Sequence, residues 1–164
     1  KTRLVIRHAT NRSKPMTNNV EELATYLQPY LERLSVGERA KLSKQIGRDL
    51  RKNQGKRIST QQNPDGSTYT PRRKRLREQK GKIKRKMFTK LKNTAHLKLL
   101  STADAIAIGF VGRVARIAQV HQEGLKDRAE RGAPSVVYPK RELLGFTDQD
   151  LKLIEDSFLK HINL

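Results

Sequence analysis

The feature that most constrains this chain is a run of positive charge in its middle, Pro71–Lys92. The run holds twelve of the 36 lysines and arginines and one acidic residue, Glu78, so it carries +11 of the net charge of +20. A segment with this much like charge and few apolar residues does not form the interior of a domain. We therefore expect a basic arm over about residues 63–92, which begins at the strong turn signal Asn63–Gly66.

Such an arm has two uses, and the sequence leaves both open. Lysines and arginines neutralise phosphates through charge density alone, so the arm is suited to nucleic acid. The alternative is an arm that is solvated and mobile in the free monomer and becomes ordered only on a neighbouring subunit during assembly. Stacking residues are scarce, since Tyr69 and Phe88 are the aromatic residues nearby, and base readout is therefore poorly supported. The candidate contacts to DNA or to another subunit are Arg72, Arg73, Lys74, Arg75, Arg77, Lys82, Lys84, Arg85 and Lys86, and the candidate inter-subunit anchors are Met87, Phe88 and Leu91.

The composition and the motifs exclude several classes of site. The chain has no cysteine, which rules out disulfides, zinc fingers, iron–sulfur sites and cysteine nucleophiles. His121 has no second ligand at the expected spacing, so we interpret it as a partly buried structural histidine. Asp148 and Asp150 fall in the first turn of a predicted helix, where carboxylates favour the helix dipole. Because neither a phosphate-binding loop nor a nucleophile elbow is present, we expect no enzyme, no metal and no cofactor.

Hydrophobic periodicity places the chain in the α+β class. We expect an N-terminal helical hairpin, the long basic arm, a small antiparallel sheet with a short helix, and a closing C-terminal helix. The expected elements are a helix from 19 that Pro29 ends or kinks, a helix from Ser35, strands at 96–100 and 105–110, a helix over 112–122, a loop over 124–135, an edge strand at 136–138, and a last helix from 147. Gly47, beside a stripe of Leu42, Ile46 and Leu50, indicates close packing against another helix.

The ends of the chain bear on the number of domains. Residues 1–15 are basic and precede Met16, so we expect an N-terminal extension that adds little to the fold, with an ordered strand at Thr2–His8 as the alternative. Residues 16–164 then form one domain, which suits a chain of this length. Because no stretch approaches 18 consecutive apolar residues, we expect no membrane-spanning helix.

The helix expected over 112–122 has two different faces. Val114, Ile117, Ala118 and His121 recur at helical spacing and predict an apolar face. Arg113 and Arg116 lie together on another side of the helix. That side is either solvated or an interface, and the sequence favours neither.

Several motifs follow one another in the order found in a known family. They are the turn Asn63-Pro-Asp-Gly66, the basic run Pro71–Arg77, and the stretches Met87–Leu91, Gly109–Gly124 and Tyr138–Thr147. On these residues, and over roughly 17–160, the chain resembles the phage virion morphogenesis family of contractile-tailed phages. The resemblance does not include Lys1–Pro15.

The resemblance implies a non-enzymatic structural protein that acts late in tail assembly, at the head-proximal end of the tail. It implies assembly in the host cytoplasm, a final place in the virion, and a homo-oligomer in the form of a hexameric ring. The implied partners are other tail and neck proteins (the tube, the sheath or terminator, and the head connector) and genomic DNA in the channel, with no membrane. Positive charge around such a channel tolerates DNA without reading its sequence.

The alternative interpretation is a sequence-nonspecific nucleic-acid-binding module. Its charge would serve a monomer that binds nucleic acid tightly. A tail protein, in contrast, is expected as a ring or on virions.

Overall fold

The computed structural model describes residues 5–8, 18–72, 86–128 and 132–162. The fold is α+β, as the sequence predicts, with helices, strands and a closing helix in the expected order. The elements are β1 (Val5–His8), α1 (Asn18–Leu31), α2 (Val36–Thr60), β2 (Leu97–Ser101), β3 (Ala105–Phe110), α3 (Arg113–Glu123), β4 (Lys126–Arg128), β5 (Ser135–Val137) and α4 (Asp148–Ile162). In the described part of the chain, no helix is long and apolar enough to cross a membrane.

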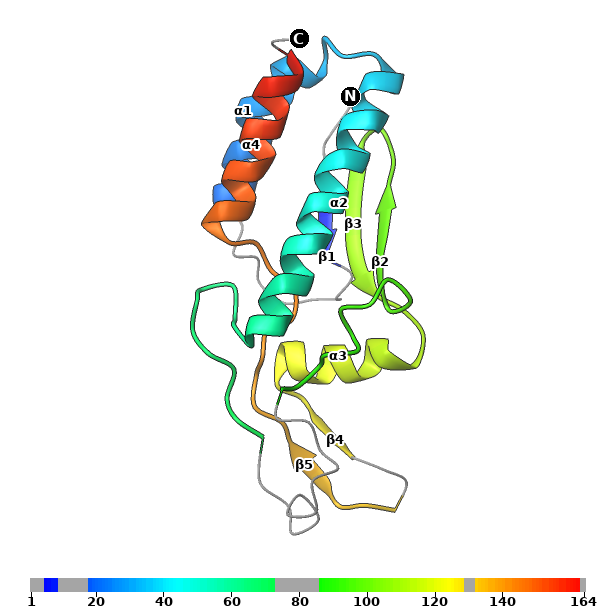
Figure 1. The fold of residues 1–164 in the computed structure, drawn as a ribbon, viewed down its shortest axis with the longest axis vertical. Helices are drawn as coiled ribbons and strands as arrows, with labels where there is room; N and C mark the ends of the chain where they lie inside the picture. Colours follow the sequence, from blue (N-terminus) through cyan, green and yellow to red (C-terminus); the bar gives the residue numbers. More distant parts are fainter. Residues whose placement is uncertain (1–4, 9–17, 73–85, 129–131, 163–164) are drawn as a thin grey trace.

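The long helix α2 is the axis of the molecule. It starts at a capping box, in which the Ser35 hydroxyl accepts from the Glu38 N–H and the Glu38 carboxylate accepts from the Ser35 N–H at 2.8 Å. Figure 1 shows α2 between the sheet of β1, β2 and β3 on one side and the pair α1 and α4 on the other. The helices α1 and α2 follow each other through a short turn, as expected for a hairpin, but α1 packs chiefly against α4 from the other end of the sequence.

Gly47 allows the close approach of α2 to the sheet. A Cβ atom at this position would lie 2.5 Å from Leu99 Cδ1 and 3.2 Å from Ile106 Cγ2. The expectation that Gly47 faces another helix is therefore wrong, because the stripe of α2 that contains Leu42, Ile46 and Leu50 packs partly on the strands.

The larger sheet has three strands in the order β1-β3-β2. Strands β2 and β3 form the predicted antiparallel hairpin, with Leu99 opposite Ile108. Strand β1 adds to β3 in parallel, with Val5 opposite Ala105. For Val5–His8, therefore, the strand alternative holds, and the expectation of an extension that adds little to the fold does not. Residues 1–4 and 9–17 lie outside the described part.

A smaller second layer holds α3 and the β4–β5 ribbon at the other end of the molecule (Figure 1). The expected loop over 124–135 is wrong at Lys126–Arg128, which pairs with β5 through Asp127 opposite Val136. Three-residue strands are too short to stand out by alternation alone. The buried residues of this second core are Ile58, Tyr69, Met87, Ala118 and Leu143.

The closing helix α4 is fixed at its first turn. The Asp150 N–H donates to the Thr147 hydroxyl at 3.1 Å, and the Thr147 N–H donates to the Asp150 carboxylate at 3.1 Å. Asn53 of α2 also donates to Asp150, at 2.9 Å. The buried carboxylate thus caps α4 and joins it to α2, which adds a tertiary contact to the first-turn role expected from the sequence.

The two cores meet at a buried arginine on α2. Leu50 lies in the first core and Ile58 in the second, and Arg57 between the cores is 8% exposed. Its guanidinium donates to the backbone oxygens of Glu142 at 2.8 Å, Leu143 at 3.1 Å and Gln62 at 3.2 Å. Burial lowers the Arg57 pKa, and these oxygens replace the water that would otherwise solvate the charge.

Gln54 completes this arrangement one turn earlier on α2. Its amide donates to the Gly145 oxygen at 2.8 Å, and its own oxygen accepts from Arg57 at 2.5 Å. The segment 142–145, which leads into α4, is therefore held on α2 by two side chains.

We predict that Arg57→Met lowers the free energy of unfolding by about 2–4 kcal/mol, because several buried carbonyl groups lose their donor. Denaturant unfolding of the purified variant measures this decrease. Arg48→Met is the matched control, because Arg48 is exposed on the same helix and its replacement should change stability by less than about 0.5 kcal/mol. Equal stabilities of the two variants would contradict the role given to Arg57.

Candidate assembly and nucleic-acid interface

The structure shows both ends of the basic run but not its centre. Arg72 and Lys86 are described and both are exposed. The other candidate contacts, Arg73, Lys74, Arg75, Arg77, Lys82, Lys84 and Arg85, lie outside the described residues. What the described residues reveal is how the two ends are held.

The end that enters the run is held by Arg141. The chain leaves α2 at Gln61, turns at Asn63–Gly66, and returns so that the Tyr69 N–H donates to the Gln61 oxygen at 2.7 Å. Arg141 is 3% exposed, and its guanidinium donates to the backbone oxygens of Thr70 at 2.7 Å and Pro71 at 3.2 Å. The chain is thereby fixed up to the residue before Arg72.

On the other side of residues 73–85, Gln61 binds the backbone of the chain. This residue has a left-handed backbone, with φ of 63°, and ends α2. Its side-chain oxygen accepts from the Met87 N–H at 2.7 Å, and its amide donates to the Met87 oxygen at 2.8 Å. Both ends of the charged run are therefore fixed on the second core, close to the end of α2.

The three predicted anchors lie in this core of their own chain. Met87 is 7% exposed, and Phe88 and Leu91 pack against the same cluster. The expectation that the flanks 63–72 and 86–92 become ordered only in an assembly therefore differs from the structure, because Tyr69 and Met87 have apolar partners within the chain. A contact of the same three anchors with a second subunit stays a prediction.

His121 stands at the centre of a polar and aromatic cluster beside these ends. Its Nδ1 accepts from Arg141 at 2.9 Å, which requires that nitrogen to be unprotonated because a guanidinium only donates. The rings of Phe88 and Tyr138 lie against it, with centroids 4.8 and 5.0 Å away. This agrees with the partly buried structural histidine expected from the sequence. Among the described residues, no group of three or more His, Asp or Glu could hold a metal.

Burial lowers the pKa of His121 to about 4, and the charges of Arg141 and Arg72 act in the same direction. Arg72, the first charged residue of the basic run, is exposed but lies close enough to His121 to lower the pKa of its imidazole. The cluster of Arg141, His121, Phe88 and Tyr138 therefore lies beside the described ends of the charged run.

Arg113 and Arg116 are both exposed on α3. Arg116 pairs with Asp127 of β4 at 2.5 Å, and this hydrogen bond holds the Asp127 pKa below its usual range. The predicted apolar face is wrong at Ile117, which is 48% exposed, while Val120 is buried instead. Helix α3 packs on one side against β3 and Leu143, so Ile117 faces outward with the arginines. An exposed isoleucine beside arginines suits a protein interface, and this use of Arg113 and Arg116 stays a prediction.

Sequence reasoning missed Arg57, Gln61 and Arg141, the residues that shape this region. Each acts through contacts with backbone atoms tens of residues away, as in the pair Gln61 and Met87. Their local sequence carries no signal, since lone arginines and glutamines are ordinary surface residues.

We predict that, because of His121, the free energy of unfolding decreases as the pH falls through a defined window. Because its pKa is about 4 in the folded state and about 6.5 in the unfolded state, the unfolded chain binds the extra proton between those values. The contribution is complete above pH 6.5 and disappears as the pH falls towards 4. Wild type should therefore lose more unfolding free energy than His121→Gln between pH 7 and pH 5. Parallel pH profiles, or an NMR titration of His121 near 6.5, would contradict this.

Comparison with known proteins identifies the family. Residues 18–163 match the model of the phage virion morphogenesis family. The chain is also similar to the Tail completion protein S of Escherichia phage P2, with 35% identity over 147 residues, which make up 88% of this chain and 98% of that protein. No solved structure matches the fold. Both matches indicate a structural protein of virion assembly and not an enzyme, and the chain belongs to the phage virion morphogenesis family.

Proposed function

We propose that this chain completes the head-proximal end of a phage tail and makes the tail competent to join the DNA-filled head. The observation that carries the proposal is the similarity to a tail completion protein over 98% of that protein's length. An alignment over nearly a whole protein supports a shared role more strongly than a shared motif does. The site of action, the neck, follows from the same proposal.

The way in which both ends of the basic run are held on the second core supports a role in assembly. Residues 73–85 carry eight basic residues and one acid between ends that Arg141 and Gln61 hold together. A charged segment with both ends fixed loses less entropy on binding than a free tail of the same length. It is suited to contact acidic surfaces of neighbouring subunits, the tube, the sheath or terminator, the head connector, or DNA in the channel.

A hexameric ring is the form in which we propose that the chain acts. Rings form from head-to-tail contacts, in which two different faces of each subunit meet. The chain offers exposed apolar residues on separate elements, among them Leu100 on β2, 70% exposed, and Val137 on β5, 65% exposed. Six subunits would match the symmetry of a contractile tail.

The rival function, a sequence-nonspecific nucleic-acid-binding module, is favoured by the charge alone. The two functions differ in what the nucleic acid does. The module binds nucleic acid as its ligand, whereas the tail protein surrounds DNA that passes through its channel.

Head–tail joining in vitro tests the proposed function directly. Tails made without this protein should join DNA-filled heads, and yield infectious particles, after addition of the purified chain. Joining that proceeds equally without the chain would contradict the proposal. The control is the same protein after heat unfolding, which should not restore joining.

We predict that replacing Arg72, Arg73, Lys74 and Arg75 by glutamine weakens DNA binding and joining while assembly persists. Each ion pair with a DNA phosphate that the replacement removes should reduce the slope of log affinity against log salt by about 0.9, whatever the DNA sequence. The matched control replaces four exposed cations of α2, Lys41, Lys44, Arg48 and Lys52, by glutamine, which removes the same charge. Equal slopes in the two variants would contradict a DNA contact at 72–75. A variant at 72–75 that stays monomeric, together with a wild-type ring that binds no DNA, would show that this charge serves assembly.

A further inference from the structure

The two most exposed large apolar side chains of the described residues lie on strands with an open edge. Leu100 of β2 is 70% exposed, and Val137 of β5 is 65% exposed. Strand β2 is the last in the order β1-β3-β2, and β5 pairs with β4, so among the described strands each has a neighbour on one side only. An open edge presents backbone groups to which another strand can bond.

The edge of β5 lacks the charged side chains that commonly protect an open strand. Its residues are Ser135, Val136 and Val137, and all three are exposed. Its partner β4, in contrast, carries Lys126 and Arg128. Because β-branched residues favour strands and a two-stranded ribbon is only marginally stable by itself, β5 is suited to gain a second neighbour.

The hydrogen bonds of the ribbon indicate which backbone groups of β5 are open. The Tyr138 N–H donates to the Leu125 oxygen at 3.0 Å. Bonded and non-bonded pairs alternate along an antiparallel ladder, so Val136 is the next residue that bonds to β4. Ser135 and Val137 therefore direct their backbone groups to the open side.

The same alternation identifies the open groups of β2. The Thr102 N–H donates to the Ala105 oxygen at 2.8 Å, next to the ladder between β2 and β3. The even-numbered residues of β2 therefore bond to β3. Leu99 and Ser101 direct their backbone groups to the open side.

One antiparallel register joins the open groups of both strands, with the opposing pairs Val137 and Leu99, Val136 and Leu100, and Ser135 and Ser101. The first and the last of these pairs are hydrogen-bonded, and the middle pair is not. Side chains approach most closely in a non-bonded pair, where the two Cα atoms lie about 4.5 Å apart. Val136 would thereby cover the exposed Leu100.

This register also ends at the same point on both strands. It places Pro139 opposite Leu97. Proline has no N–H to donate, and the Leu97 N–H already donates to the Asn93 oxygen at 2.8 Å. Neither residue therefore has an N–H that the pairing would leave without an acceptor.

The two strands belong to separate layers of one chain, because α3 lies between the ribbon and the sheet (Figure 1). We propose that β5 of one subunit adds to the open edge of β2 in a neighbouring copy of this chain, in the antiparallel register above. Pairing of two β5 strands, or of two β2 strands, would leave Leu100 or Val137 uncovered. A contact between two different edges repeats from subunit to subunit and forms a ring when the rotation closes. The inference rests on the ring of the proposed function and deepens it, because it names the contact that builds the ring.

Disulfide crosslinking tests the register, because the chain has no cysteine of its own. One preparation carries Val136→Cys and a second carries Leu100→Cys, and the two are mixed, assembled and mildly oxidised. A Cα separation of about 4.5 Å permits a disulfide. Covalent dimers that contain one chain of each kind should therefore form at least about tenfold faster than in the control pairs, through the effective concentration that assembly provides.

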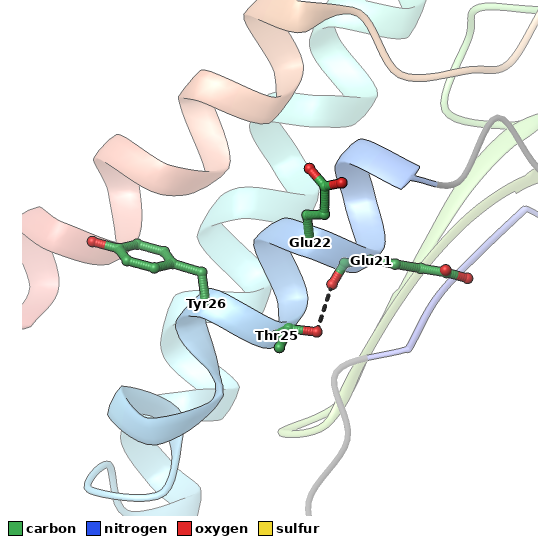
Figure 2. A pocket seen from close by; sticks show the side chains of 4 residues that line it. All are labelled: Glu21, Glu22, Thr25 and Tyr26. Atoms are coloured by element: carbon green, nitrogen blue, oxygen red, sulfur yellow. Dashed lines mark hydrogen bonds between the residues drawn. The ribbon is translucent and has the colours of Figure 1, made fainter.

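The matched control pairs Leu100→Cys with Val137→Cys. Val137 is more exposed than Val136, which is 36% exposed, but its side chain lies on the other face of β5. Accessibility alone would therefore give the opposite order of rates. A second control pairs Leu100→Cys with Thr25→Cys, because Thr25 is an exposed residue of α1, beside Glu21 in Figure 2.

The outcomes separate this inference from the proposed function. Rings that form normally, but link Leu100→Cys to Val136→Cys no faster than to Val137→Cys, overturn the inference and leave the proposed function standing. Rings that crosslink as expected but do not restore head–tail joining overturn the proposed function and leave the contact standing. Wild type that stays monomeric, and still restores joining, overturns the inference and the ring together.

Discussion

The buried guanidinium of Arg57 is the interaction on which the arrangement of this molecule depends. It lies on α2 between the two cores and donates to the backbone of the segment that leads into α4. The residue just before that segment, Arg141, holds the chain that enters the basic run. One short stretch, 141–145, therefore positions both the acidic helix α4 and the basic run. Arg57 and Arg141, which no sequence pattern singles out, thus position the negatively charged helix α4 and the positively charged run.

The parts of the fold that the sequence predicts are those set by local chemistry. The capping box at Ser35 and Glu38 places the start of α2, and the alternation around 96–110 gives the hairpin of β2 and β3. The parts it does not predict depend on distant partners. The parallel pairing of β1 needs β3 about a hundred residues later, and Ile117 is exposed because Val120 and Ala118 take the buried side of α3. For the candidate site, the density of basic residues located the run. No local sequence pattern indicated that Gln61 and Arg141 bind the backbone at the two ends of the run.

The family and the physical chemistry converge on a protein that acts through its surfaces. The chain belongs to a family of virion morphogenesis, and its described residues place charge and exposed apolar groups on the outside of two small cores. A chain with separated acidic and basic regions favours partners in a fixed orientation, since like regions repel and unlike regions attract.

The most direct test of the central proposal, that this chain acts as a ring of subunits and not as a monomeric nucleic-acid-binding module, is the native mass of the purified protein before and after nuclease treatment. We expect a closed oligomer of one stoichiometry whose mass does not change when nucleic acid is digested. A monomer that carries nucleic acid before digestion, and remains a monomer afterwards, would contradict the claim and support a nucleic-acid-binding module.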